Sequence, residues 1–213
     1  MIAPEMIRGE IEMPNFVHKW RSTVLRRRQI VETLRKIIIK YGSEHVTVRK
    51  LAKEIGVSEG AIYRRFKSKR EILLFLVEDI EEGLIGGIEN AYPLKNPLDF
   101  LEEFSRNLLS SIQQRRGDSF LVIAEIISLG DKKVNRKIAF VLSTFLDRLK
   151  QVIVDGINAG EIRKSVDPEM AATFFFGMHQ GLATNWALGG FPPTLQKESD
   201  SMCKLFLEGI KNG

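Results

Sequence analysis

Four signals that start helices fall within about fifty residues of one another near the beginning of the chain, and they constrain the fold more than any other feature. A first helix is predicted over 30–41, where apolar residues recur at helical spacing and a glycine follows. Thr47, Ser58 and Ser68 are good N-cap residues for three more helices. Helix signals dominate the rest of the chain and strand signals are scarce, so the predicted fold class is all-α.

The second and third predicted helices lie on either side of a tight turn at Gly56 and Val57, which is the sequence pattern of a helix-turn-helix. The second helix, 48–55, has apolar residues at i, i+3, i+4 and i+7, so they share one face. In this motif the following helix, here 59–66, projects into the major groove of DNA. A helical hairpin with a glycine turn also occurs in proteins that never bind DNA, so the outer face must decide between the two interpretations.

Small and hydrogen-bonding residues form the outward face of the segment 59–66 once its apolar residues are assigned to the core. Gly60 costs the helix up to about 1 kcal/mol in propensity, which suggests that close approach of the backbone to base edges matters more there than helix stability. Tyr63 can offer its hydroxyl to a phosphate, and Arg64 can reach a phosphate or a guanine. This face favours a helix that reads DNA.

Positive charge is concentrated at the same end of the chain. Residues 1–72 hold 17 Lys and Arg against 8 Asp and Glu, whereas residues 73–213 hold 15 against 19. A basic module joined to a mildly acidic one is typical of a protein that binds a polyanion with one end. The alternative is a solvated basic face with no partner, since Lys and Arg are mostly exposed in any protein.

The stretch from Thr47 to Lys69 resembles the DNA-binding signature of TetR-type (tetracycline-repressor-like) transcriptional regulators. The resemblance covers about 50 residues, from Arg26 to Leu76, and rests on the Gly-Val-Ser turn, the Tyr-x-x-Phe pair and the Lys-Ser-Lys that follows. It implies an N-terminal three-helix helix-turn-helix domain plus a C-terminal helical ligand-binding and dimerisation domain. It also implies a homodimer, a near-palindromic double-stranded DNA operator and a small-molecule effector held by the second domain, most simply in a repressor. The many phenylalanines and methionines after residue 70 favour an effector of hydrophobic or amphipathic character.

The resemblance assigns roles to individual positions of the DNA-binding module. Thr47 and Arg49 correspond to phosphate contacts, the segment from Ser58 to Arg64 to the reading helix, and Lys69 to a phosphate contact at the start of the fourth helix. Glu59 and Arg64 depart from the residues more usual in the family, so the operator cannot be copied from a relative. The candidate DNA-binding residues are Thr47, Arg49, Ser58, Glu59, Gly60, Ala61, Tyr63, Arg64 and Lys69.

The domain boundaries follow from these assignments. We expect an N-terminal arm over 1–25, a helix-turn-helix domain over 26–72 and a helical ligand-binding and dimerisation domain over 73–213. The basic residues of the arm suit a segment that lies along phosphates or in the minor groove. A disordered tail, or packing of its aromatic residues onto the fold, are the alternatives.

Two further sets of candidate residues lie in the C-terminal domain. The segment 168–187 combines aromatic with small residues, and glycines four apart let another helix come close, so with the last helix it is the expected dimer interface; an internal core helix is the alternative. The predicted interface residues are Phe174, Gly177, Gly181, Leu182, Trp186, Leu205 and Phe206. Polar residues within apolar segments could orient an effector, although each is individually more typical of a core or surface position. The candidate ligand-binding residues are Phe104, Asn107, Glu125, Phe175, Met178, His179 and Asn185.

Other functional classes find little support in the sequence. The phosphate-loop and zinc-protease motifs are absent, and no Asp, Glu or His cluster has metal-ligand spacing, so we expect no enzyme, no metal and no cofactor. The longest apolar run, 72–77, is too short to cross a bilayer, and we expect no membrane partner. The lone Cys203 and the lack of a secretory signal favour a cytoplasmic location.

One rival to the ligand-responsive regulator remains. It is a DNA-bound factor whose C-terminal domain docks another protein. An enclosed apolar cavity in that domain would favour a ligand, and a filled core with an exposed apolar patch would favour docking.

Overall fold

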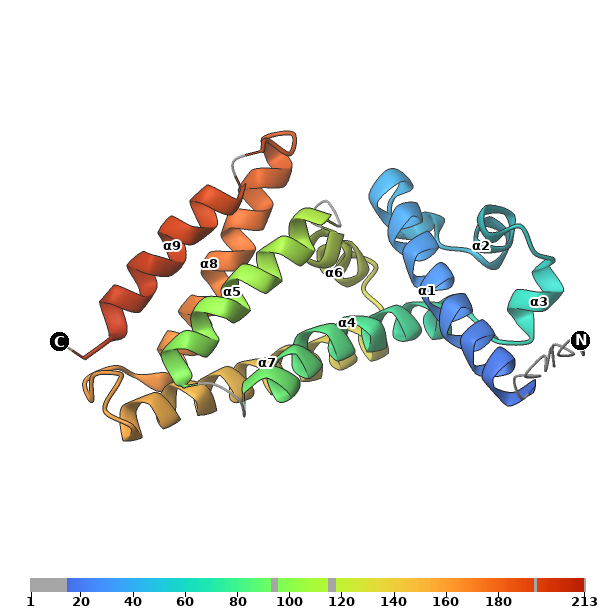
Figure 1. Ribbon diagram of the computed structural model, residues 1–213. Helices are drawn as coiled ribbons and strands as arrows, with labels where there is room; N and C mark the ends of the chain where they lie inside the picture. Colours follow the sequence, from blue (N-terminus) through green and yellow to red (C-terminus); the bar gives the residue numbers. More distant parts are fainter. Residues whose placement is uncertain (1–14, 93–95, 115–117, 194, 213) are drawn as a thin grey trace, which may run out of the picture.

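The computed structural model describes residues 15–92, 96–114, 118–193 and 195–212. Within these ranges the chain is helical, apart from the connecting segments and one isolated β-bridge between Ile162 and Lys211 (Figure 1). The helices run α1 (Asn15–Tyr41), η1 (Ser43–His45), α2 (Val48–Ile55), α3 (Glu59–Tyr63), α4 (Lys69–Ala91), α5 (Pro97–Gln114), α6 (Asp118–Ser128), α7 (Lys132–Asn158), α8 (Pro168–Leu188) and α9 (Leu195–Ile210).

The predicted cap residues begin the helices of the N-terminal module. The Thr47 hydroxyl accepts a hydrogen bond from Lys50 N at 3.1 Å, and the Ser58 hydroxyl accepts one from Ala61 N at 3.2 Å. Gly56 ends α2 with φ +78°, a left-handed conformation that side chains rarely adopt, and it thereby makes the turn into α3. Buried apolar side chains from α1, α2, α3 and the start of α4 join these helices, among them Leu34, Ile37, Leu51, Ile62 and Leu76.

The first helix is longer than the sequence pattern predicts. It begins at Asn15, so residues 15–25, which we assigned to a separate arm, continue α1; the rest of that arm lies outside the described residues. No glycine or proline occurs between Asn15 and Tyr41, and nothing in that stretch therefore ends a helix. At the other boundary, α3 ends at Tyr63 instead of Phe66, because the chain tightens into a turn in which the Arg65 N–H bonds to the Ile62 carbonyl, three residues back.

The C-terminal domain is a bundle in which α7 packs against α4 and α8, and α5 packs against α9. Figure 1 shows α4 leaving the DNA-binding module and running beside α7 into this domain. Aromatic rings fill its centre: the Phe104 ring centroid lies 5.4 Å from that of Phe100, 6.0 Å from Phe145 and 6.4 Å from Phe175. In the described part of the chain, none of the helices combines the length and the apolar character needed to cross a membrane.

Candidate DNA-binding and regulatory sites

The α3 surface presents the residues that the sequence predicted to face DNA. Ile62 and Phe66 are buried and fix this short helix to the core. Ser58, Glu59 and Gly60 at its start are exposed. Tyr63 and Arg64 at its end are also exposed, and Ala61 is half-buried. The structure therefore leaves the predicted reading face open to a partner.

Glu59, the acidic residue of the reading helix, forms an ion pair with a second candidate DNA contact. Its carboxylate lies 3.4 Å from Arg49 Nε on α2. Both side chains are largely exposed, so the pair contributes little to stability. The ion pair instead links the start of α3 to α2 and directs the Glu59 carboxylate toward α2.

We expect Glu59→Ala to relax base preference at one position of each half-site, because a carboxylate can accept a hydrogen bond from the amino group of cytosine. Selection of duplexes from a random pool by the wild type and the variant measures this change. Arg49→Ala is the matched control, since it breaks the same ion pair and removes a predicted phosphate contact without removing the carboxylate. Identical consensus sequences for wild type and Glu59→Ala would remove Glu59 from base reading.

Lys69 begins α4 in the position of a predicted phosphate contact. Its ammonium donates a hydrogen bond to the Glu44 carbonyl at 3.1 Å, and burial of the amine lowers the pKa of Lys69 below its usual value. The preceding Ser68 accepts a hydrogen bond from Glu71 N, and the Glu71 carboxylate accepts one from Lys67 N. The start of α4 is thus fixed to the DNA-binding module.

Lys69→Ala should weaken binding to all DNA sequences alike and lower the slope of log affinity against log salt by about one unit for each phosphate that the lysine neutralises. The readout is the operator dissociation constant between about 50 and 200 mM salt, a window wide enough to resolve such slopes. Lys53→Ala, which removes an exposed lysine from α2, is the control with the same charge change. An unchanged slope for Lys69→Ala would place Lys69 away from DNA.

A stacked cluster that sequence patterns did not predict joins the end of the reading helix to α1 and α4. The guanidinium of Arg27 lies 4.8 Å from the Phe75 ring centroid, and that of Arg65 lies 5.0 Å from it. Phe75 also packs edge-on against Phe66. Helical spacing identified the apolar stripe, but it gave no signal that two arginines from distant segments share one ring.

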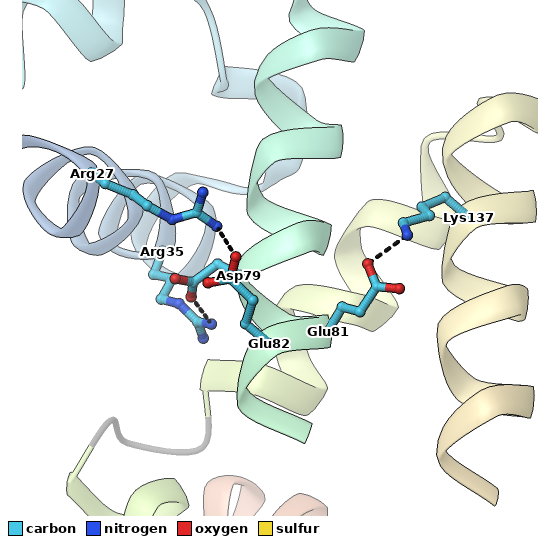
Figure 2. Close-up of polar contacts among 6 residues, drawn as sticks. All are labelled: Arg27, Arg35, Asp79, Glu81, Glu82 and Lys137. Atoms are coloured by element: carbon cyan, nitrogen blue, oxygen red, sulfur yellow. Dashed lines mark hydrogen bonds and ion pairs between the residues drawn. The ribbon is translucent and has the colours of Figure 1, made fainter. Parts of the chain in front are cut away.

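Acidic residues in the middle of α4 hold the helices on both of its sides (Figure 2). Asp79 and Glu82 pair with Arg35 and Arg27 of α1, at 3.2 Å and 3.1 Å. Glu81 pairs with Lys137 of α7. Arg35 is almost fully buried, so its pair with Asp79 is the least solvated of the three. Through these pairs α4 contacts the DNA-binding module on one face and the C-terminal domain on the other.

A second polar junction links the two domains at the ends of α6 and α7. Arg70 Nε donates to the Asp131 carboxylate at 2.8 Å, and this bond holds the pKa of Asp131 below its usual value. Ser43 N donates to the Glu125 carboxylate at 3.1 Å, and the Ser43 hydroxyl donates to the Glu125 carbonyl at 2.8 Å. Glu125, predicted as a ligand contact, thus serves as a domain contact, because α6 packs on α1 and η1.

The other predicted ligand residues are divided between core and surface. Phe104 and Phe175 belong to the buried aromatic cluster, and His179 packs against Phe175. Asn107 and Asn185 are exposed, so the structure does not bring them together with the cluster. Their segments are amphipathic helices, and one sequence cannot fix which side of a helix an isolated asparagine takes.

His179 forms a buried polar bridge between α5 and α8. Its Nδ1 lies 2.6 Å from the Phe175 carbonyl, which can only accept, so Nδ1 carries the proton. The Ser105 hydroxyl then donates to Nε2 at 2.7 Å. Burial lowers the pKa of His179 to about 4, so the ring is neutral near pH 7. Among the described residues, no three His, Cys, Asp or Glu side chains gather as a metal site would require.

The outer faces of α8 and α9 form an exposed apolar surface. Phe174 and Leu205 are 64% and 75% exposed, and they border a groove of about 480 Å³. No atom from another part of the described chain lies within 4 Å of a Cβ built on Gly177 or Gly181. Met178 also lines this groove and Leu182 is half-buried.

Two of the predicted interface residues are internal to the subunit. Trp186 is buried, with its indole N–H donating to the Pro192 carbonyl, and it packs against Phe191. Phe206 is buried between Phe174 and Phe175. The loop after α8 folds back and covers the Trp186 ring, so Trp186 does not lie on the exposed α8 and α9 surface.

A helix-turn-helix with an exposed reading helix, joined by one continuous helix to a second helical domain, defines a DNA-binding transcriptional regulator. Residues 30–75 match the sequence model of the bacterial regulatory proteins of the tetR family, and residues 94–209 match that of the YsiA-like protein, C-terminal region. The chain belongs to the TetR family, whose members are regulators and not enzymes. The family and the all-α fold class predicted from the sequence are confirmed.

Similar proteins cover most of the chain. It is 27% identical over 186 residues to the fatty acid metabolism regulator protein of Bacillus subtilis (strain 168), across 86% of this chain and 95% of that protein. It is 26% identical over 184 residues to the nucleoid occlusion factor SlmA of Haemophilus influenzae (strain PittGG), across 83% and 81% of the two chains. The structure of FadR from Bacillus subtilis in complex with stearoyl-CoA is 26% identical and has a TM-score of 0.76, covering 86% of this chain and 98% of that one.

Proposed function

We propose that the protein is a homodimeric repressor that binds a near-palindromic operator and is released from it by a small amphipathic effector with a long acyl chain. The observation that carries this proposal is the placement of α4. Its first turn, which begins at Lys69, lies in the DNA-binding module, and the rest of the helix packs along α7 and α5. A ligand that displaces α4 would therefore move the reading helix.

The exposed α8 and α9 surface supports the homodimer. A contiguous apolar surface of this kind is typical of an interaction site, and the open positions at Gly177 and Gly181 leave room for a helix to approach closely. Two copies joined through this surface would form a four-helix interface. Such a dimer must hold its two reading helices about 34–36 Å apart to fit consecutive turns of one DNA face.

The acyl-chain effector is supported by one relative and by the contents of the core. FadR of Bacillus subtilis was solved with stearoyl-CoA, and the present chain is similar to it over most of its length. The centre of the C-terminal domain is aromatic, so an acyl chain that inserted there would meet apolar side chains.

A contact between the aromatic cluster and α4 gives the effector a route to DNA. A Cβ built on Gly87 of α4 would lie 3.3 Å from Phe104 Cε2, so the ring packs closely over α4 at this glycine. A chain that inserts among the rings must shift Phe104, and Phe104 then presses on α4. The DNA-binding conformation of the dimer and the conformation with displaced α4 would differ in their affinity for the effector, and this difference supplies the free energy of release from DNA.

The experiment is a titration of the protein–operator complex with stearoyl-CoA, stearate and coenzyme A, followed by fluorescence anisotropy of the labelled duplex. We expect stearoyl-CoA to release DNA and coenzyme A alone to leave the complex intact. Release by stearate as well would show that the acyl chain suffices. Calorimetric binding of stearoyl-CoA with unchanged operator affinity would exclude the proposed switch.

Docking of another protein is a second candidate function. It is favoured by the apolar groove on α8 and α9, which is open at the surface while aromatic rings fill the core. A dimer that forms without Phe174 and Leu205 would leave this groove free for such a partner. The variants described in the Discussion therefore distinguish the two functions.

A further inference from the structure

Helix α1 extends well beyond the part of the chain that matches the DNA-binding module of the family. The match begins at residue 30, whereas α1 begins at Asn15. At about 1.5 Å per residue the additional helix is roughly 20 Å long. Among the side chains of α1 that the structure describes, 26–41, the buried apolar ones begin at Ile30.

This extension is strongly basic. Residues 15–29 include five Lys and Arg residues and no Asp or Glu: Lys19, Arg21, Arg26, Arg27 and Arg28. The first turn of α1 contains no acidic residue. A run of positive charge without acidic residues is typical of a segment that binds a polyanion.

The contacts of Arg27 place the extension beside the reading helix. Arg27 and Arg65 both stack on the Phe75 ring, and Arg65 lies two residues beyond the end of α3. In Figure 1 the first turns of α1 continue past the start of α4 on the side where α3 lies. Arg26 and Arg28 are exposed on this part of the helix.

We propose that residues 15–28 of α1 form a second DNA-contacting element, which binds phosphates next to the half-site read by α3. Arg27, near the C-terminal end of the basic extension, is fixed beside the DNA-reading surface. A DNA duplex is therefore the polyanion within reach of the extension. The contacts are electrostatic and carry no sequence information of their own. The proposal rests on the DNA-binding class of the protein and is independent of any effector.

The test compares the salt dependence of operator binding between full-length wild type and variants, without effector. The triple variant Lys19→Ala, Arg21→Ala, Arg26→Ala should lower the slope of log affinity against log salt by about 2 units or more. Each neutralised phosphate contributes roughly 0.9 to this slope, and a dimer carries two copies of the helix. Alanine favours helix, so the change removes charge without breaking α1.

The matched control removes three exposed lysines from the C-terminal domain by Lys133→Ala, Lys164→Ala and Lys211→Ala. It has the same change in net charge, and we expect it to leave the slope within about 0.5 unit of the wild type, because screening at about 0.1 M salt limits charge effects to about 10 Å. The charge-conserving variant Lys19→Arg, Arg21→Lys, Arg26→Lys should keep the wild-type slope.

Three results would overturn the proposal. The first is a wild-type slope in the triple alanine variant, which would show that the basic residues of α1 do not contact phosphates while α3 still binds the operator. The second is an equal loss in the C-terminal control, which would assign the effect to net charge. The third is an equal loss in the charge-conserving variant, which would assign it to the fold of α1.

Discussion

Phe174→Glu combined with Leu205→Glu should convert the protein into monomers and lower operator affinity by about 100- to 10,000-fold, because loss of the dimer removes the second half-site and the effective concentration that links the two binding events. The two side chains are largely exposed in the single chain, so the substitutions leave its core intact. In a dimer they would place carboxylates in an apolar interface, where a charge is costly to desolvate.

Sedimentation gives the oligomeric state, and a gel shift with one or two half-sites gives the affinity. Phe140→Glu is the matched control: Phe140 is 59% exposed, but it lies on α7, outside the α8 and α9 surface. The control should stay dimeric and bind the operator as the wild type does. A double variant that remains a dimer would show that another surface joins the subunits and would strengthen the docking alternative.

The α8 and α9 surface illustrates how far a sequence pattern can predict an exposed face. Phe174, Gly177 and Leu205 are exposed on two helices whose pattern of small and aromatic residues is visible in the sequence. Trp186 has the same spacing, yet it is buried because the loop that follows α8 returns over it. Helical periodicity identifies a face, but a loop that covers part of the face depends on tertiary structure.

The structure of the DNA-binding module was more predictable from the sequence than that of the C-terminal domain. Its caps at Thr47, Ser58 and Ser68 act within three residues along the chain, so local sequence determines them. The pairs Arg35–Asp79 and Ser43–Glu125 join residues 44 and 82 positions apart. Such contacts depend on how helices cross, which no local pattern encodes. The acidic residues of α4 were visible in the sequence, but the basic residues of α1 and α7 with which they pair were not.

The second large effect is expected at the Arg35–Asp79 pair between α1 and α4. Arg35 is 5% exposed and Asp79 is 25% exposed, so Asp79→Asn removes a charge partner of a buried guanidinium. Breaking a fully buried pair in this way costs about 3–5 kcal/mol, and the partial exposure of Asp79 reduces the expected loss in the free energy of unfolding to about 2–3 kcal/mol. Urea denaturation measures the loss.

Glu82→Gln is the matched control for this prediction. It breaks the pair with Arg27, which joins the same two helices, but Glu82 is 68% exposed. We expect this control to lose less than about 1 kcal/mol. Equal losses in Asp79→Asn and Glu82→Gln would show that burial of Arg35 does not govern the strength of the α1–α4 contact.

Replacing both partners separates stability from signalling at this contact. Arg35→Met with Asp79→Leu should recover most of the stability, because apolar side chains of similar size commonly replace a buried pair without loss. The charge pair has a defined geometry, whereas the apolar substitutes can slide past each other. If the double variant is stable and binds the operator but needs more stearoyl-CoA for release, the pair transmits the motion of α4 to α1. If release is unchanged, packing alone carries that motion, and the role of the pair is confined to holding the two helices together.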